Sequence, residues 1–113
     1  MLVAFSFRAK PGKEKEFEQL LNSPESGLKA AKGMGATRNI LFMGGGRRIR
    51  VLEFPDDAKP VSMLEIAERD PRFKEFLRKM GAIVEDGFDI DRPETLDAFN
   101  RRNAFTLAYD VRP

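Results

Sequence analysis

The chain has 113 residues, of which 42% are hydrophobic and 34% charged, and this balance is typical of one globular domain rather than a disordered segment. It contains no cysteine and no histidine, which excludes disulfide bonds, thiolate nucleophiles, zinc fingers and proton transfer by histidine. The 20 basic and 18 acidic residues are interleaved along the chain and form no basic stripe, so we expect no nucleic-acid partner.

Residues 2–9 predict a first strand. Val3, Phe5 and Phe7 lie on one face, and small or polar residues that include Ser6 lie on the other. This start is too short to be a signal peptide, and no apolar run is long enough to span a membrane. We therefore expect a cytoplasmic protein that does not interact with a membrane.

Two helical segments follow the first strand. Residues 13–21 carry apolar side chains at helical spacing, and Ser23-Pro24 interrupts them. Serine is a good helix cap and proline suits a first helical turn, so a second helix is expected from Pro24 to the glycines at 33–35.

A β-hairpin is predicted in the middle of the chain. Strands over residues 37–43 and 47–54 are joined by Gly44-Gly45-Gly46. A glycine-rich loop can also cradle phosphate, but such a loop precedes a helix, whereas here a strand follows. Leu41 and Phe42 are adjacent, so the alternation does not show which face of this strand points inward.

The C-terminal half begins with helical residues 60–67, and Asp70-Pro71 restarts the helix with Asp70 as its cap. Apolar side chains then recur at steps of three and four, at Phe73, Phe76, Leu77, Met80, Ile83 and Val84. A short helix over residues 93–99 and a final strand over residues 105–111 complete the chain.

This order of elements predicts an α+β fold of the ferredoxin-like βαββαβ type. Right-handed crossovers place the helices on one face of a four-stranded antiparallel sheet. Leu2, Leu41 and Leu52 are expected on the other face, where water would otherwise reach them. We therefore expect a homodimer in which two sheets pack together as a dimeric α/β barrel.

Several segments resemble known proteins of aromatic polyketide biosynthesis. Residues 38–42, 50–53 and 56–57 resemble the hairpin of the tetracenomycin-type aromatic polyketide cyclases, and residues 70–73 resemble the helix restart of that family. Residues 93–108 are similar to the SchA/CurD-like proteins of aromatic polyketide gene clusters. The start of the chain, residues 7–13, is common to many dimeric α/β-barrel proteins.

The resemblance implies a homodimer that uses no cofactor and no metal and has a cavity between sheet and helices. Its substrate would be a poly-β-ketone, free or bound to an acyl carrier, and its reaction an aldol ring closure in antibiotic biosynthesis. Cyclases of this family can carry histidine where Arg50 stands, so a histidine mechanism does not transfer to this chain.

Five residues are candidates for the chemistry. Arg38 and Arg50 would polarise a carbonyl or hold an enolate oxygen, because guanidinium stays charged and presents several donors. Asn39 would orient a carbonyl or a water, Glu53 would act as a base if burial raised its pKa, and Tyr109 would donate a proton. Each also has a structural interpretation, as an exposed strand residue, a cross-strand ion pair or, for Tyr109, part of the core.

An apolar substrate pocket is predicted beside these residues. Its expected lining is Ser6, Phe42, Met63, Phe73, Phe76 and Met80. The same helix stripe would also be typical of an ordinary hydrophobic core.

Two other functions fit the same fold. One is a cofactor-independent monooxygenase acting on an aromatic polyketide, although such enzymes use tryptophan or histidine that this chain lacks. The other is a non-catalytic dimerisation or ligand-binding module, in which the cavity would be closed or filled.

Overall fold

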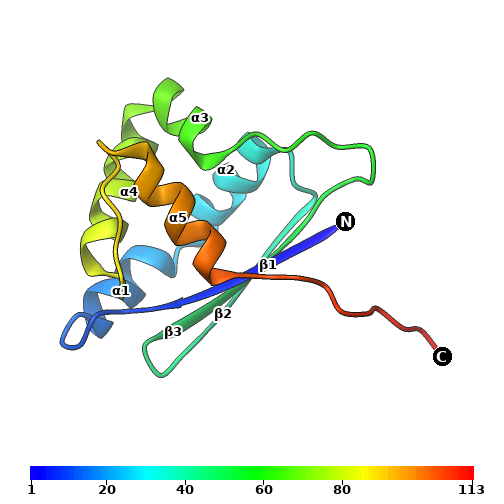
Figure 1. The fold of residues 1–113 in the computed structure, drawn as a ribbon, viewed down its shortest axis with the longest axis horizontal. Helices are drawn as coiled ribbons and strands as arrows, with labels where there is room; N and C mark the ends of the chain where they lie inside the picture. The colour runs from blue at the N-terminus through cyan, green and yellow to red at the C-terminus, as the bar shows by residue number, and fades with distance from the viewer.

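A computed structural model describes residues 1–113 and shows an α+β protein with a four-stranded antiparallel sheet and five helices (Figure 1). The strands lie in the order β2-β3-β1-β4, which is compatible with a ferredoxin-like layout. The elements are β1 Leu2–Arg8, α1 Glu14–Leu21, α2 Pro24–Met34, β2 Arg38–Gly44, β3 Arg47–Glu53, α3 Met63–Arg69, α4 Pro71–Ile83, α5 Pro93–Asn103 and β4 Ala104–Phe105. No helix is long and apolar enough to cross a membrane.

Two predicted helix starts, at Pro24 and at Pro71, are confirmed by their caps. The Ser23 side chain accepts a hydrogen bond from the backbone N–H of Ser26, and Asp70 accepts from the N–H groups of Arg72 and Phe73. Ser62 caps α3, so this helix starts at Met63 instead of residue 60. Helix α5 extends to Asn103, four residues beyond the predicted end.

All helices lie on one side of the sheet (Figure 1). We call the side that they cover the inner face and the opposite side the outer face. Phe7 is at the centre of the inner layer, with its ring centroid 5.4 Å from that of Phe99 and 6.0 Å from that of Phe17. These contacts hold β1 against α1 and α5.

The strand register decides which residues share a face. On β1 and β3, Phe5 is opposite Arg50 and Val3 is opposite Leu52, while on β2 Leu41 is opposite Arg50. Leu41 and Leu52 therefore face the helices, and their predicted place on the outer face is wrong. The outer face instead carries Leu2, Ala4, Ile40, Phe42, Ile49, Val51 and Phe105.

The final strand is much shorter than predicted. Only Ala104 and Phe105 pair with β1, and the rest of the predicted strand leaves the sheet as an extended tail (Figure 1). In this antiparallel register residue 108 would lie opposite Met1, so the residues beyond it have no neighbouring strand. Tyr109 is 80% exposed on this tail, which removes it from the core.

Candidate functional site

Two arginines on β3 are buried on the inner face. Arg48 is 1% exposed and Arg50 is 8% exposed, and they are the only charged residues among the buried ones. Neither takes part in any of the ion pairs of the protein. The Nε–H groups of both are buried without a hydrogen-bond partner. Buried guanidinium groups normally have carboxylate partners, so this pair is unusual.

Arg48 is held by weak partners. Its guanidinium carbon lies 4.7 Å from the centroid of the Phe7 ring, and its Nη1 lies 3.9 Å from the sulfur of Met80. A cation over an aromatic face and a thioether acceptor both compensate charge only in part. These contacts fix the position of the side chain but leave most of its hydrogen-bonding capacity unused.

Burial changes the acidity of both arginines. Loss of hydration lowers the pKa of Arg48 well below its ordinary value, and repulsion by Arg50 lowers it further. Loss of hydration also lowers the pKa of Arg50 to about 10. Arg50 therefore remains charged at neutral pH, in a setting that disfavours the charge.

The two arginines line a cavity of about 480 Å³ between the sheet and the helices. Its other residues are mainly apolar and include Phe5, Phe7, Leu20, Met34, Met63, Ile66, Phe73, Phe76 and Met80. Asp70 is the only acidic residue among them, and its Oδ1 already accepts the two N–H groups at the start of α4. Lys29 and Arg72 add further positive charge, so the cavity is apolar in its body and positive overall.

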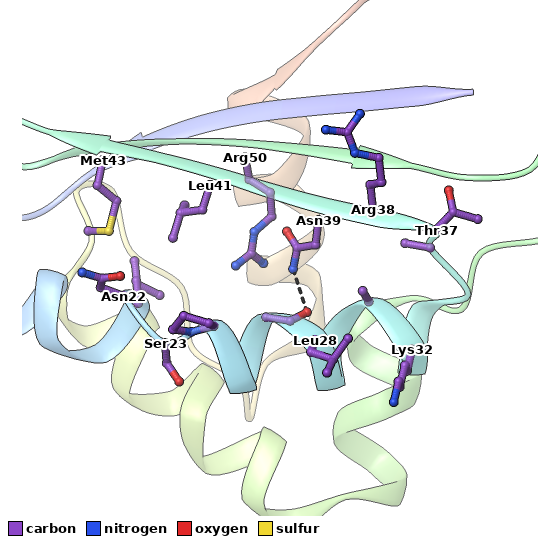
Figure 2. A pocket seen from close by; sticks show the side chains of 15 residues that line it. Asn22, Ser23, Leu28, Lys32, Thr37, Arg38, Asn39, Leu41, Met43 and Arg50 are labelled. Atoms are coloured by element: carbon purple, nitrogen blue, oxygen red, sulfur yellow. Dashed lines mark hydrogen bonds between the residues drawn. The ribbon is translucent and has the colours of Figure 1, made fainter.

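A second cavity, of about 670 Å³, lies between α2 and β2 (Figure 2). Arg50 and Gly27 line both cavities. Asn39 points from β2 toward α2, and its Nδ2 donates a hydrogen bond to the Gly27 carbonyl at 3.0 Å. Its Oδ1 is buried and has no partner. The site therefore presents unused donors on Arg48 and Arg50 and one unused acceptor on Asn39.

The structure brings seven of the predicted site residues to these cavities. Four of them, Met63, Phe73, Phe76 and Met80, line the cavity of about 480 Å³. Arg50 lines both cavities, and Arg38 and Asn39 line the one beside α2.

The other four predicted residues lie elsewhere. Phe42, Ser6 and Glu53 have their strand positions on the outer face, because each is an odd number of residues from an inner-face residue of its strand. Arg38 shares this face by its strand position, although it also borders the cavity beside α2. Figure 2 shows the Arg38 side chain turned away from Arg50. Glu53 accepts a hydrogen bond from the Thr37 hydroxyl at 3.3 Å instead of pairing with Arg50. Tyr109 is on the exposed tail, outside both cavities.

Arg48 is not among the candidate residues that the sequence predicts. The available signal is its spacing, because residues i and i+2 of a strand share a face and Arg48 must lie beside Arg50. The sequence Arg47-Arg48-Ile49-Arg50 also contains an arginine at the exposed hairpin end, so composition alone does not separate Arg47 from Arg48.

No group of three or more acidic side chains is placed to hold a metal ion. Comparison with protein-family models gives no match, and comparison with curated proteins gives none either. The site must therefore be interpreted from its own chemistry: an apolar cavity that contains two buried cations without counter-ions.

Proposed function

We propose that the protein is a cytoplasmic, cofactor-free polyketide cyclase, which folds a poly-β-ketone and directs its aldol ring closure in aromatic polyketide biosynthesis. The observation that supports this most is the buried guanidinium of Arg50, which lines an apolar cavity without an acidic partner. The substrate would reach the cavity free or bound to an acyl carrier.

The chemistry needs few groups from the protein. A methylene between two carbonyls is already acidic, so a weak base such as water suffices to remove its proton. The larger tasks are to bring two carbons together and to stabilise the oxygen on which charge develops. The Phe and Met side chains supply a surface for the first task, and Arg50 supplies fixed donors for the second. Asn39 lines the neighbouring cavity beside α2, and its unused Oδ1 would accept a hydrogen bond from an enol hydroxyl of a substrate that extends past Arg50 into that cavity.

The cavity favours this proposal over a non-catalytic module. Such a module would have a closed or filled interior, whereas about 480 Å³ lies open between sheet and helices. A monooxygenase of the same fold is also less favoured, because the only tyrosine of the chain is outside the cavity and tryptophan and histidine are absent.

The proposal includes a homodimer of the α/β-barrel type. Phe42 and Ile49 are directly opposite each other on the outer face and are 59% and 41% exposed. Phe105 continues the same apolar face from β4 and is 61% exposed. A second copy packed sheet to sheet would remove these side chains from water, while leaving the inner-face cavity of each subunit intact.

Replacement of Arg50 tests the cyclase function. In Arg50→Ala we expect turnover to fall about a hundred- to a thousandfold, the usual effect of losing one oxyanion donor. Arg50→Lys should recover little, because ammonium lacks the planar fork of donors. The measurement is the ratio of correctly cyclised product to shunt products, with Arg101→Ala on the exposed surface of α5 as control. An unchanged ratio in Arg50→Ala would remove the catalytic role.

A further inference from the structure

We infer that Arg48 and Arg50 act as one clamp that binds the substrate as a preformed β-dicarbonyl enolate. This deepens the proposed function, on which it rests for the identity of the dicarbonyl, and it adds Arg48 to the binding site. The ligand is thus an anion before any carbon–carbon bond forms.

The charge of this cavity favours an anionic ligand. Arg48 and Arg50 are both buried, and the only acidic residue of the lining has its Oδ1 engaged in the helix cap of α4. A buried charge that lacks a partner is costly, and the cost is recovered when a counter-ion enters. Because no side chain forms an ion pair with either arginine, a bound anionic ligand would supply the missing counter-ion.

The spacing of the two arginines suits an anion with two oxygens. They are two residues apart on one strand and face the same side, which separates their Cα atoms by about 6.5–7 Å. The Nε–H groups of both are buried and have no hydrogen-bond partner in the protein. A β-dicarbonyl enolate spreads one negative charge over two oxygens, so each arginine can donate to a different oxygen.

The surroundings of the clamp strengthen this interaction. Arg48 is positioned by the Phe7 ring and the Met80 sulfur, and phenylalanine and methionine side chains line the remaining wall. Coulomb attraction is much stronger in such a poorly polarisable environment than in water. The phenylalanine faces would also pack against the apolar part of the ligand.

This arrangement gives a chain without histidine a way to form its nucleophile. One C–H bond of the central methylene breaks, its electron pair spreads over the two carbonyl oxygens, and the proton passes to water. The clamp stabilises the resulting anion, so the bound dicarbonyl should lose its proton at a lower pH than the free compound. No strongly basic side chain is then required.

The pKa of a bound β-diketone tests this directly. The probe is 1-phenylbutane-1,3-dione, whose enolate absorbs at a longer wavelength than its neutral forms, titrated with and without excess protein. An opposite charge within hydrogen-bonding range shifts the pKa of an acid by about 1–3 units, so we expect the bound pKa to be lower by at least about one unit. Equal pKa values for bound and free probe would overturn the inference.

Variants test whether the two arginines cause the shift in the pKa of the bound diketone. Arg48→Met and Arg50→Met should each reduce it, while Arg101→Met on the exposed surface of α5 should leave it unchanged. A shift in Arg48→Met equal to that of the parent protein would overturn the clamp. If Arg48→Met fails to fold, Arg48→Lys keeps the charge without the fork, and we expect it to show a smaller shift than the parent protein.

A comparison of a carboxylate ligand with its uncharged amide distinguishes a site for enolates from a site for carboxylates. If 2-naphthoate binds better than 2-naphthamide while the diketone pKa does not move, the site binds carboxylates and the enolate inference is wrong. The diketone titration and the product ratio of Arg50→Ala also distinguish failure of the clamp from failure of the proposed function. A shifted diketone pKa together with unchanged products in Arg50→Ala would leave the clamp intact and remove the proposed function, and the reverse result would remove the clamp alone.

Discussion

Arg48 on β3 and Phe7 on β1 are direct partners across the sheet, and the guanidinium of Arg48 lies over the Phe7 ring at 4.7 Å. A cation–π contact of this kind contributes about 0.5–2 kcal/mol. The effective cost of burying a charged group is several kcal/mol. The contact therefore holds Arg48 in place without offsetting its burial, and the fold in its free form carries a destabilising charge pair.

The first prediction is that removing either buried charge stabilises the free protein. Arg48→Met and Arg50→Met should each raise the free energy of unfolding by about 1–3 kcal/mol, because methionine fills a similar space without a charge to desolvate. Denaturant unfolding of the parent and both variants measures this. Arg101→Met, on the exposed surface of α5, should stay within about 0.5 kcal/mol of the parent protein.

The pH dependence of the Arg50→Met effect follows from the direction of the pKa shift. The pKa of Arg50 is lowered from its ordinary value to about 10 in the fold, so the unfolded chain holds this proton more strongly. The destabilisation is complete below the folded pKa and declines as the pH rises from there toward the unfolded pKa. The advantage of the variant should therefore be constant from neutral pH to just below about 10. A variant less stable than the parent protein across this range would contradict the prediction.

The second prediction concerns the outer face. Phe42→Asp places a charge opposite Ile49 in the middle of the exposed apolar surface, and it should convert a sheet-to-sheet dimer to monomers. Sedimentation velocity at micromolar concentration distinguishes the two species. Leu28→Asp is the matched control, since Leu28 is 57% exposed on α2 in the helical layer. A parent protein that sediments only at 12.8 kDa would exclude the dimer.

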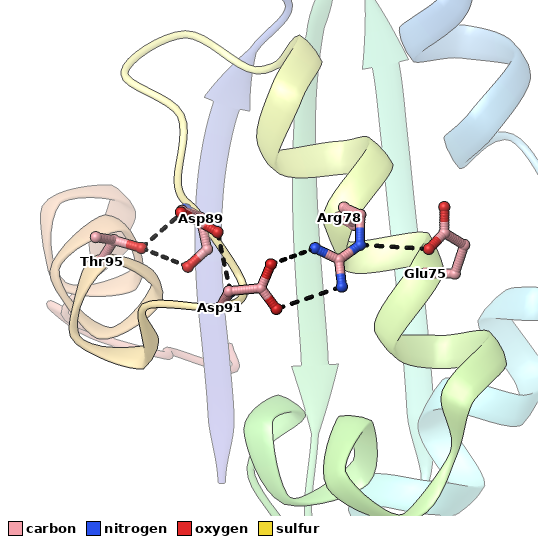
Figure 3. Close-up of polar contacts among 5 residues, drawn as sticks. All are labelled: Glu75, Arg78, Asp89, Asp91 and Thr95. Atoms are coloured by element: carbon pink, nitrogen blue, oxygen red, sulfur yellow. Dashed lines mark hydrogen bonds and ion pairs between the residues drawn. The ribbon is translucent and has the colours of Figure 1, made fainter.

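The third prediction concerns the loop between α4 and α5 (Figure 3). Arg78 on α4 donates two hydrogen bonds to Asp91, and it also contacts Glu75. The hydrogen bond from Arg78 lowers the pKa of Asp91. Asp91→Asn should lower the melting temperature by a few degrees at most at neutral pH, because both side chains are well exposed.

Acid should abolish the difference between the Asp91→Asn variant and the parent protein. A lowered pKa in the fold contributes stability above the unfolded pKa, and this contribution is lost as the pH falls through the folded pKa. Melting temperatures measured from neutral pH downward should thus converge. A difference that persists after Asp91 is fully protonated would show that the hydrogen-bond geometry, and not the charge, is responsible.

The fourth prediction concerns the close approach of α4 to the loop that follows it. A Cβ at Gly81 would lie 2.2 Å from the carbonyl oxygen of Phe88 and 3.0 Å from its ring. The first clash is with backbone, so Gly81→Ala must displace the loop and should cost about 1–3 kcal/mol or more.

Gly27 provides the contrasting control. A Cβ there would meet only the Asn39 Nδ2 at an ordinary 3.5 Å, so Gly27→Ala should be neutral or stabilising by up to about 1 kcal/mol through its better helix propensity. Urea unfolding of the two variants measures both effects. Similar destabilisation in both would contradict the clash at Gly81.

Local sequence determined most of the elements of this protein. The alternation of Val3, Phe5 and Phe7 specifies a strand with one apolar face, and Ser23 and Asp70 specify where two helices begin. Such features depend on backbone geometry and on hydrogen bonds between near neighbours, so they can be predicted without knowledge of the rest of the chain. The helix residues of the cavity, from Met63 to Met80, follow from the same periodicity.

Only the tertiary structure decided which face of the hairpin is covered. Period-two spacing predicts that Arg48 and Arg50 share a face of their strand, and the hairpin places Arg38 and Glu53 on neighbouring strands. Neither pattern shows which side of the sheet the helices cover. The register with β1 fixes that side by placing Arg50 beside Phe5. It also leaves the tail after Phe105 without a partner strand, and Tyr109 is therefore exposed. The candidate site is thus a product of long-range pairing, because one shared register buried two arginines and placed four other predicted residues, Ser6, Arg38, Phe42 and Glu53, on the outer face.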